Sequence, residues 1–186
     1  MTGKAAANGH MLDGFGGASD ALERTILASP LLGGGLPREA QEHLDKAAER
    51  YHLTDVAETH IYSAADIAPD HAAVLIAFYR FYFYKGRLSE ALNIARSCMR
   101  KAMELSVLGD DWRRVEATDA DFSDCGALLP RFFLFSLKGY AYLNLRLGKL
   151  DEGREAAEKL LALEPRDRIG AQVLIDVLNA MEEADD

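Results

Sequence analysis

The feature that most restricts the fold is a short pattern that recurs three times along the chain. The copies are His52–Ala57, Gly86–Ala91 and Gly148–Gly153, and each ends on a small residue five positions after its start. The first two small residues are 91 − 57 = 34 positions apart, and the last two are 153 − 91 = 62 positions apart, which is 34 plus 28. A fixed period of this length is typical of stacked structural repeats. The sequence therefore predicts three repeated units, with an insertion before the third.

The repeated units are predicted to be pairs of helices. After Pro37, apolar residues recur at helical spacing, and strand-like alternation is rare. Pro37 and Pro130 suit the first turn of a helix, whereas Gly86 and Gly148 suit a C-terminal stop. N-caps are expected at Thr54, Ser89 and Asp151. Seven helices are expected, at 37–51, 54–67, 71–85, 89–105, 129–147, 151–163 and 167–183.

These units resemble the tetratricopeptide repeat (TPR), a helix–turn–helix unit with a period of about 34 residues. In that pattern a glycine closes the first helix, small residues follow where two helices cross, and a proline ends the unit. The matching residues are Ala57, Ala64 and Pro69 in the first unit, Gly86, Ala91 and Cys98 in the second, and Gly148, Gly153 and Pro165 in the third. His52 replaces the turn glycine of the first unit. Met103 replaces the closing proline of the second, so that helix is expected to run on.

The resemblance implies an all-α fold, a right-handed α-solenoid of three TPR-like helix pairs with a C-terminal capping helix. Residues 1–36 hold eight of the fifteen glycines and are expected to form a flexible tail, in which Ser19 or Asp20 could cap a short helix. Residues 37–183 are expected to form the helical domain. Within it we place repeats at 38–69, 70–105 and 131–165, an insertion at 104–130 and the capping helix at 167–183.

The resemblance also implies a concave groove lined by the first helix of each pair. Carried over position by position, the groove residues are Lys46, Arg50, Arg80, Phe83, Tyr84, Lys138, Tyr142 and Arg146. Arg and Tyr tend to anchor protein interfaces, and cations can pair with a partner's carboxylates. The function expected is that of a scaffold, adaptor or chaperone-like module that holds a partner segment carrying acidic residues. The groove lacks the asparagines of carboxylate-clamp TPR domains, so chaperone-tail binding is not predicted.

The expected helix at 129–147 is apolar around nearly its whole circumference, so it should be buried on several sides. The insertion before it carries Trp112 and Phe122 as expected anchors, together with six acidic residues between Asp110 and Asp124. It is interpreted either as a covering loop or as a second, acidic contact surface. Two alternative functions follow: a homodimer formed by this helix and the insertion, or a small-molecule pocket between the insertion and the expected helix at 71–85.

Composition limits the other classes of function. The net charge of −9 argues against nucleic acid and against an anionic membrane surface as partners. The two cysteines, Cys98 and Cys125, are far apart in sequence, and the five histidines form no metal-binding motif. We therefore expect a cytoplasmic protein with no metal, no cofactor and no enzymatic activity. The segments YRFYFYKGRLSEAL, DWRRV and LPRFFLFSLKGYAYLNLRLG look similar to uncharacterised bacterial TPR proteins, some of them from nitrogen-fixation gene neighbourhoods.

Overall fold

The computed structural model describes residues 32, 34–124 and 126–185, and every regular element in this part of the chain is helical. The elements are α3 (Arg38–Glu49), α4 (Thr54–Ile67), α5 (Ala72–Tyr84), α6 (Leu88–Ser106), a 3₁₀ turn η2 (Trp112–Arg114), α7 (Leu128–Arg146), α8 (Leu150–Leu163) and α9 (Gln172–Asp185). The all-α prediction is confirmed for these residues. The predicted tail, 1–36, lies almost entirely outside them; Leu32 is described, and it is helical and buried.

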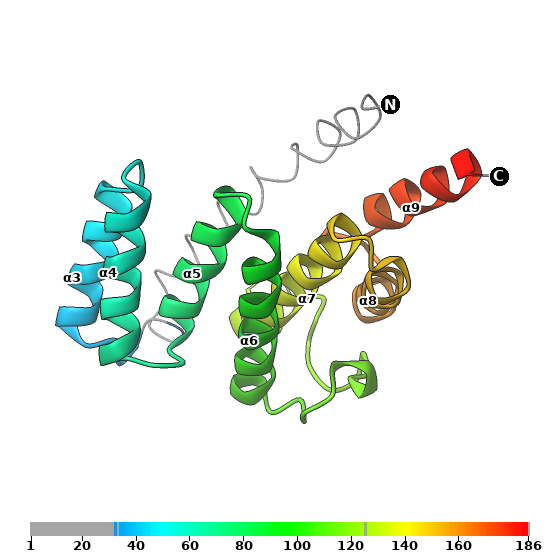
Figure 1. Cartoon of the computed structure of the whole chain (residues 1–186). Helices are drawn as coiled ribbons and strands as arrows, with labels where there is room; N and C mark the ends of the chain where they lie inside the picture. The colour runs from blue at the N-terminus through cyan, green and yellow to red at the C-terminus, as the bar shows by residue number, and fades with distance from the viewer. Residues whose placement is uncertain (1–31, 33, 125, 186) are drawn as a thin grey trace, which may run out of the picture.

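Helices that follow one another along the chain pack side by side. α3 packs on α4, α5 on α6 and α7 on α8, and α6 and α7 share a further extensive contact. α9 packs on α8 at the C-terminal end, so α3–α4 and α9 lie at opposite ends of the described molecule (Figure 1). Short connections turn the chain back between the helices of a pair, as the predicted glycine stops require.

The glycine stops act through backbone conformation. Gly86 and Gly148 take φ values of 72° and 74°, which favour glycine because it has no Cβ. After α5, Arg87 N donates to Tyr82 O at 2.9 Å; after α7, Lys149 N donates to Asn144 O at 2.9 Å. These are Schellman motifs, and they satisfy carbonyls left without a partner at a helix C-terminus.

The predicted N-caps are wrong. The N-cap positions are Leu53, Arg87 and Lys149, and none of the three contributes a capping side chain. Thr54, Ser89 and Asp151 therefore lie inside the first helical turn. The helices begin one or two residues early because each continues directly from the turn that ends the preceding helix.

The C-terminal helix begins later than the predicted residue 167. Asp167 has a φ of 49°, and its carboxylate accepts hydrogen bonds from Ala171 N and Gln172 N. A side chain that satisfies free amides ahead of a helix acts as a cap. Residues 167–171 thus form the turn before α9, which starts at Gln172.

Small residues lie where helices cross, as the repeat pattern predicts. Ala57 and Ala91 have no exposed surface. A Cβ added at Gly153 would lie 2.2 Å from Leu145 Cδ2 and 3.2 Å from Ala141 O. Only glycine therefore allows α7 and α8 to approach this closely.

The insertion before α7 covers the third helix pair. Trp112 and Phe122 are both buried, and their rings lie 6.1 Å from Tyr140 and 6.0 Å from Phe133, centroid to centroid. Arg113 pairs with Glu152 and Glu155 of α8, both at 2.8 Å. These contacts explain why α7 is apolar all round: α6, α8 and the insertion enclose it.

Candidate partner-binding site

A cleft of about 650 Å³ lies between α3 and α5. Its walls are mostly apolar, and its polar groups lie mainly on α3 and toward the C-terminal end of α5. The residues that line it are Gln41, Leu44, Asp45, Ala47, Ala48, Tyr51, Ile61, Ala73, Ala77, Arg80, Phe81 and Tyr84.

Small side chains create this space. Ala73 and Ala77 are one helical turn apart on α5, and Ala47 and Ala48 face them from α3. An alanine projects one methyl group, so two helices that face each other through alanines leave room between longer side chains. Ile61 of α4 contributes to the floor. The result is an apolar trough with a polar end.

Arg80 and Tyr84 form the polar end together with Tyr51. The Arg80 guanidinium carbon lies 6.0 Å from the centre of the Tyr84 ring, and Tyr84 is 48% exposed. Burial raises the pKa of the Tyr51 hydroxyl, and the positive charge of Arg80 partly opposes that rise. Arg80 therefore acts electrostatically across the cleft, from α5 onto the end of α3.

Lys85 ties the two walls together. Its ammonium group donates to Tyr51 O at 2.9 Å and lies 4.2 Å from the centre of the Tyr51 ring. The Tyr51 and Phe81 rings meet edge to face, with centroids 6.2 Å apart. These contacts fix the spacing of α3 and α5 at this end of the cleft.

Aromatic contacts link the cleft to α7, where Tyr142 is buried. Phe83 lies 5.3 Å from Tyr84 and 5.6 Å from Tyr142, centroid to centroid. Arg146 donates to the Tyr142 hydroxyl at 2.7 Å. Five predicted groove residues are thus joined in one chain of contacts: Arg80, Tyr84, Phe83, Tyr142 and Arg146.

The other three predicted residues lie elsewhere. Lys46 and Arg50 are on a different side of α3, close to His60 of α4. Burial lowers the pKa of His60, and the charges of His43, Arg50 and Lys46 lower it further. Lys138 donates to Ile169 O at 2.6 Å, and burial lowers its pKa. On α3 the cleft is lined instead by the stripe that contains Gln41, Leu44, Ala48 and Tyr51.

Tyr51 and the alanine walls were missed by sequence reasoning. The residues Ala40, Leu44, Ala47 and Tyr51 recur at spacings of three and four, which marks one helix face. That apolar stripe can be read in the sequence, and three of its residues, Leu44, Ala47 and Tyr51, line the cleft. No sequence pattern indicated the cleft itself, because the cleft depends on the distance between α3 and α5, which are not consecutive helices.

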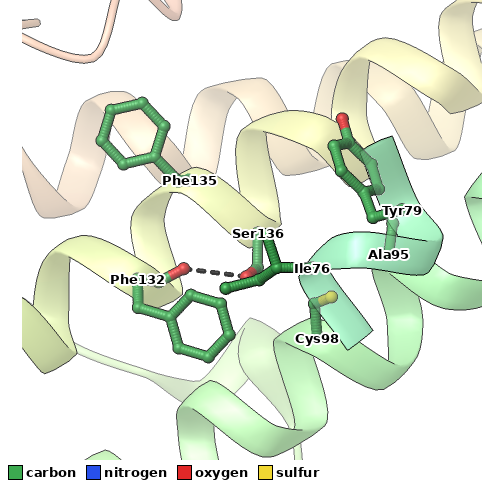
Figure 2. Close-up of a pocket in the computed structure, with 7 residues that line it drawn as sticks. All are labelled: Ile76, Tyr79, Ala95, Cys98, Phe132, Phe135 and Ser136. Atoms are coloured by element: carbon green, nitrogen blue, oxygen red, sulfur yellow. Dashed lines mark hydrogen bonds between the residues drawn. The ribbon is translucent and has the colours of Figure 1, made fainter. Parts of the chain in front are cut away.

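A second, much smaller cavity of about 30 Å³ lies between α5, α6 and α7 (Figure 2). Ser136 donates to Phe132 O at 2.8 Å, and the remaining lining is almost wholly apolar. The volume suits a single water molecule at most. This cavity is a packing defect beside Cys98 and Tyr79, and it is too small for an organic ligand.

Two further properties of the described part of the chain bear on function. No three His, Cys, Asp or Glu side chains there are grouped so that they could share a metal ion. No helix in it combines the length and the apolar character needed to cross a bilayer.

Comparison with known proteins places the chain in a family. It is 38% identical over 133 residues to a protein of Azotobacter chroococcum mcd 1 described as an "Uncharacterized 19.8 kDa protein in nifW 5'region". The match covers 71% of this chain and 74% of the relative. The chain belongs to the family of this nif-region protein. No protein-family model matches the chain, and no solved structure matches it.

Proposed function

We propose that this member of the nif-region family is a cytoplasmic protein-interaction scaffold, with a binding rather than an enzymatic role. Its α3–α5 cleft would hold a partner segment that carries acidic residues. The cleft is the observation that carries the proposal. Two helices of 12 and 13 residues form its walls, which makes it about 18 Å long. A trough of this shape suits an extended peptide or one face of a helix.

The polar end supports an acidic partner. Arg80 and Arg146 are connected through the rings of Tyr84, Phe83 and Tyr142, of which Tyr84 is exposed and Tyr142 is buried. An arginine can hold a carboxylate through two parallel hydrogen bonds, and tyrosines supply large contact area with little loss of conformational entropy. A segment with apolar side chains for the trough and a carboxylate for Arg80 would satisfy both parts of the site.

The finer architecture is also a proposal: three TPR-like helix pairs in a right-handed α-solenoid. The 34-residue step supports it, as do the buried small residues Ala57, Ala91 and Gly153 at helix crossings. In such an array the first helices, α3, α5 and α7, would form the concave face that binds the partner.

The relative's gene position suggests which partners to test. Its printed name places it in the 5' region of nifW, so we propose that the partner is produced together with the nitrogen-fixation proteins. Loss of the gene would then impair growth on dinitrogen and leave growth on ammonium unchanged. Equal growth of the mutant and the parent on both nitrogen sources would count against this assignment.

A small-molecule ligand is a second candidate for the cleft. Its volume of about 650 Å³ lies within the range of ligand pockets, and it combines apolar walls with a few polar groups. A compound that raises the melting temperature of the wild-type protein and not that of R80A/Y84A would favour this alternative.

The homodimer alternative stays a prediction, with a changed basis. It relied on the apolar helix together with the acidic insertion, but most apolar residues of α7 are buried within this chain. A homodimer through the insertion alone would use its acidic surface.

Affinity capture with matched variants tests the proposal. Tagged wild-type protein is isolated from its host during nitrogen-fixing growth, beside R80A/Y84A and the control Y62A/R100A. The control removes the same side-chain types from α4 and α6. We expect a partner that is retained by the wild type and the control and lost with R80A/Y84A, after circular dichroism confirms that all three fold. A partner retained equally by R80A/Y84A would overturn the assignment of the cleft.

A further inference from the structure

The chain that precedes α3 lies against the molecule where it enters the described structure. Leu32 is helical and only 3% exposed, and it belongs to the buried cluster that also contains Ala40 and Ala47 of α3. Leu36 is half-buried and packs against the same cluster. Residues 1–31, which precede this point in the sequence, are therefore joined to the body of the molecule close to the N-terminal end of α3.

The α3–α5 cleft begins at this same end of α3. Gln41 and Ala73 line it near the starts of the two helices. Tyr51, just after α3, and Phe81, near the end of α5, line the far end, and their rings meet there. The two helices thus run in the same direction along the cleft. A segment that passes back along the cleft from Leu32 enters between the helix starts and runs antiparallel to both helices.

Residues 20–28, with the sequence DALERTILA, carry the side chains that this cleft requires. Leu22 and Ile26 are four positions apart, so a helix in this segment presents them as one apolar strip. Glu23 stands three positions before Ile26 and supplies a carboxylate beside the strip. This is the combination that the apolar trough and its cationic end call for in a partner.

We propose that residues 20–28 of this chain occupy the α3–α5 cleft until a partner segment displaces them. The inference rests on the proposed function of the cleft and adds an internal ligand that regulates it. The apolar strip packs on the alanine walls, and the Glu23 carboxylate pairs with the Arg80 guanidinium. Arg24 is two positions from both Leu22 and Ile26, so it faces solvent.

The spacing of the charges fits this arrangement. A helix rises about 1.5 Å per residue, so with Ala28 at the entrance Glu23 lies about 8 Å into the cleft. On α5, Arg80 lies about 10 Å from Ala73, the first residue of that helix in the cleft wall. Long side chains cover the remaining difference. The acidic wall residue, Asp45, lies on α3, across the cleft from Arg80.

The connection to α3 makes even a weak contact effective. Ala28 stands four positions before Leu32 and is held within about 14 Å of it, because an extended residue spans at most about 3.6 Å. A short connection of this kind gives an effective concentration in the millimolar range. A separate partner must therefore offer the same chemistry and bind more tightly than the internal segment, and its apparent affinity falls with the fraction of open clefts.

Photo-crosslinking within the full chain is the first test. p-Benzoyl-phenylalanine replaces Ile26, and the dilute protein is irradiated, digested and analysed by mass spectrometry. We expect adducts of monomer mass on the cleft residues of α3 or α5, and none there from the same replacement at Met11. Absence of such an adduct from position 26 would overturn the proposal. An adduct of dimer mass alone would overturn it in favour of the segment of a second copy.

An exchange of charges tests the pairing of Glu23 with Arg80. In the variant that crosslinks from position 26, E23R and R80E should each lower the adduct yield severalfold, because like charges then meet. The two changes together should restore it, since the pair is again opposite in sign. R24E, on the solvent side, should leave the yield unchanged. A yield that stays low in E23R/R80E would contradict the proposed contact.

A labelled synthetic peptide of residues 17–31 then reports whether the cleft is occupied in the full chain. By fluorescence anisotropy, L22D/I26D should bind it about tenfold more tightly than the wild type, because its own segment no longer competes. M11D/L12D makes the same change of charge and polarity outside the segment and should bind like the wild type. Equal affinity in all three would overturn the proposal.

These tests separate the internal contact from the function of the cleft. Peptide binding by L22D/I26D should be lost when R80A/Y84A is added, whether or not a partner is known. A captured partner that R80A/Y84A retains would remove the proposed function and leave the internal contact standing. Failure of the crosslinking and peptide tests would remove the internal contact and leave partner capture by the cleft as proposed.

Discussion

At the scale of single residues, Gly153 shows how a sequence pattern becomes a packing constraint. Its missing Cβ lets α8 approach Leu145 and Ala141 O of α7. We expect Gly153→Ala to lower the free energy of unfolding by about 1–3 kcal/mol, because the added methyl group overpacks this crossing. Urea denaturation measures the change.

The Leu145 side chain provides the control for Gly153. In a Leu145→Ala background, Gly153→Ala should cost much less, because the atom that it strikes is gone. Equal costs in the two backgrounds would show that the crossing is not the cause. Exposed Glu158→Ala on the same helix should change little.

Val107 shows the opposite case, a residue poorly suited to its backbone. It ends α6 in the left-handed region with φ 56° and ψ 43°, and it is 89% exposed. A β-branched side chain is strained there and packs against little. Val107→Gly should raise the free energy of unfolding by about 1 kcal/mol, whereas Val107→Ala should keep most of the strain. A gain with alanine as large as with glycine would contradict this account.

At the scale of elements, α3 and α4 meet through His43 and His60, whose Nδ1 atoms are 3.1 Å apart. Burial lowers the pKa of His60, and His43, Arg50 and Lys46 lower it further. The folded pKa of His60 lies below 6.5, whereas the unfolded chain has an ordinary histidine pKa of about 6.5. Just below pH 6.5, His60 is therefore protonated more readily in the unfolded state than in the folded state. Stability should therefore be full above about pH 6.5 and fall as the pH drops toward the folded pKa.

Urea midpoints at several pH values test this prediction. His60→Gln should flatten the decline, because its side chain does not titrate; His52→Gln, which alters an exposed histidine, should leave the decline unchanged. An identical decline in His60→Gln and in the wild type would assign the acid sensitivity to other groups.

In the insertion, the sequence named Trp112 as an anchor but not the residues that it contacts. Trp112 packs on Tyr140 and lies under the Arg113 guanidinium, 4.3 Å from it. Trp112→Ala should lower the free energy of unfolding by about 3–5 kcal/mol, the usual cost of truncating a buried tryptophan. Trp112→Phe should cost much less, since it keeps an apolar ring. A small loss with alanine would indicate that the insertion contributes little to the core.

Helix existence was predictable, whereas some helix starts were not. Gly86 and Gly148 end α5 and α7 as expected, because a glycine after a helix usually takes the left-handed conformation that stops it. Thr54, Ser89 and Asp151 were misplaced, because such residues suit both the cap and the first turn. The start of α9 depends on the backbone conformation of Asp167 and on the hydrogen bonds that its carboxylate accepts. The spacing of apolar residues does not indicate either of them.

At the scale of the whole molecule, the sequence predicts which helices form but not the space between them. Arg80 and Tyr84 both line the cleft, and both were placed in the predicted groove by counting back from Gly86. Lys46 and Arg50 do not line it; they belong to the unit that has His52 in place of the turn glycine, where the pattern restrains the register least. The cleft depends on Ala47, Ala48, Ala73 and Ala77 facing one another across two helices, which no local pattern shows.

Photo-crosslinking in the host tests the central claim most directly. Tyr84 in the cleft and Tyr62 on α4 are similarly exposed, at 48% and 52%, and each is replaced in turn by p-benzoyl-phenylalanine. We predict a specific adduct with a partner protein from position 84 and none with that partner from position 62. The same partner captured from position 62 and not from position 84 would contradict the assignment of the α3–α5 cleft as the binding site.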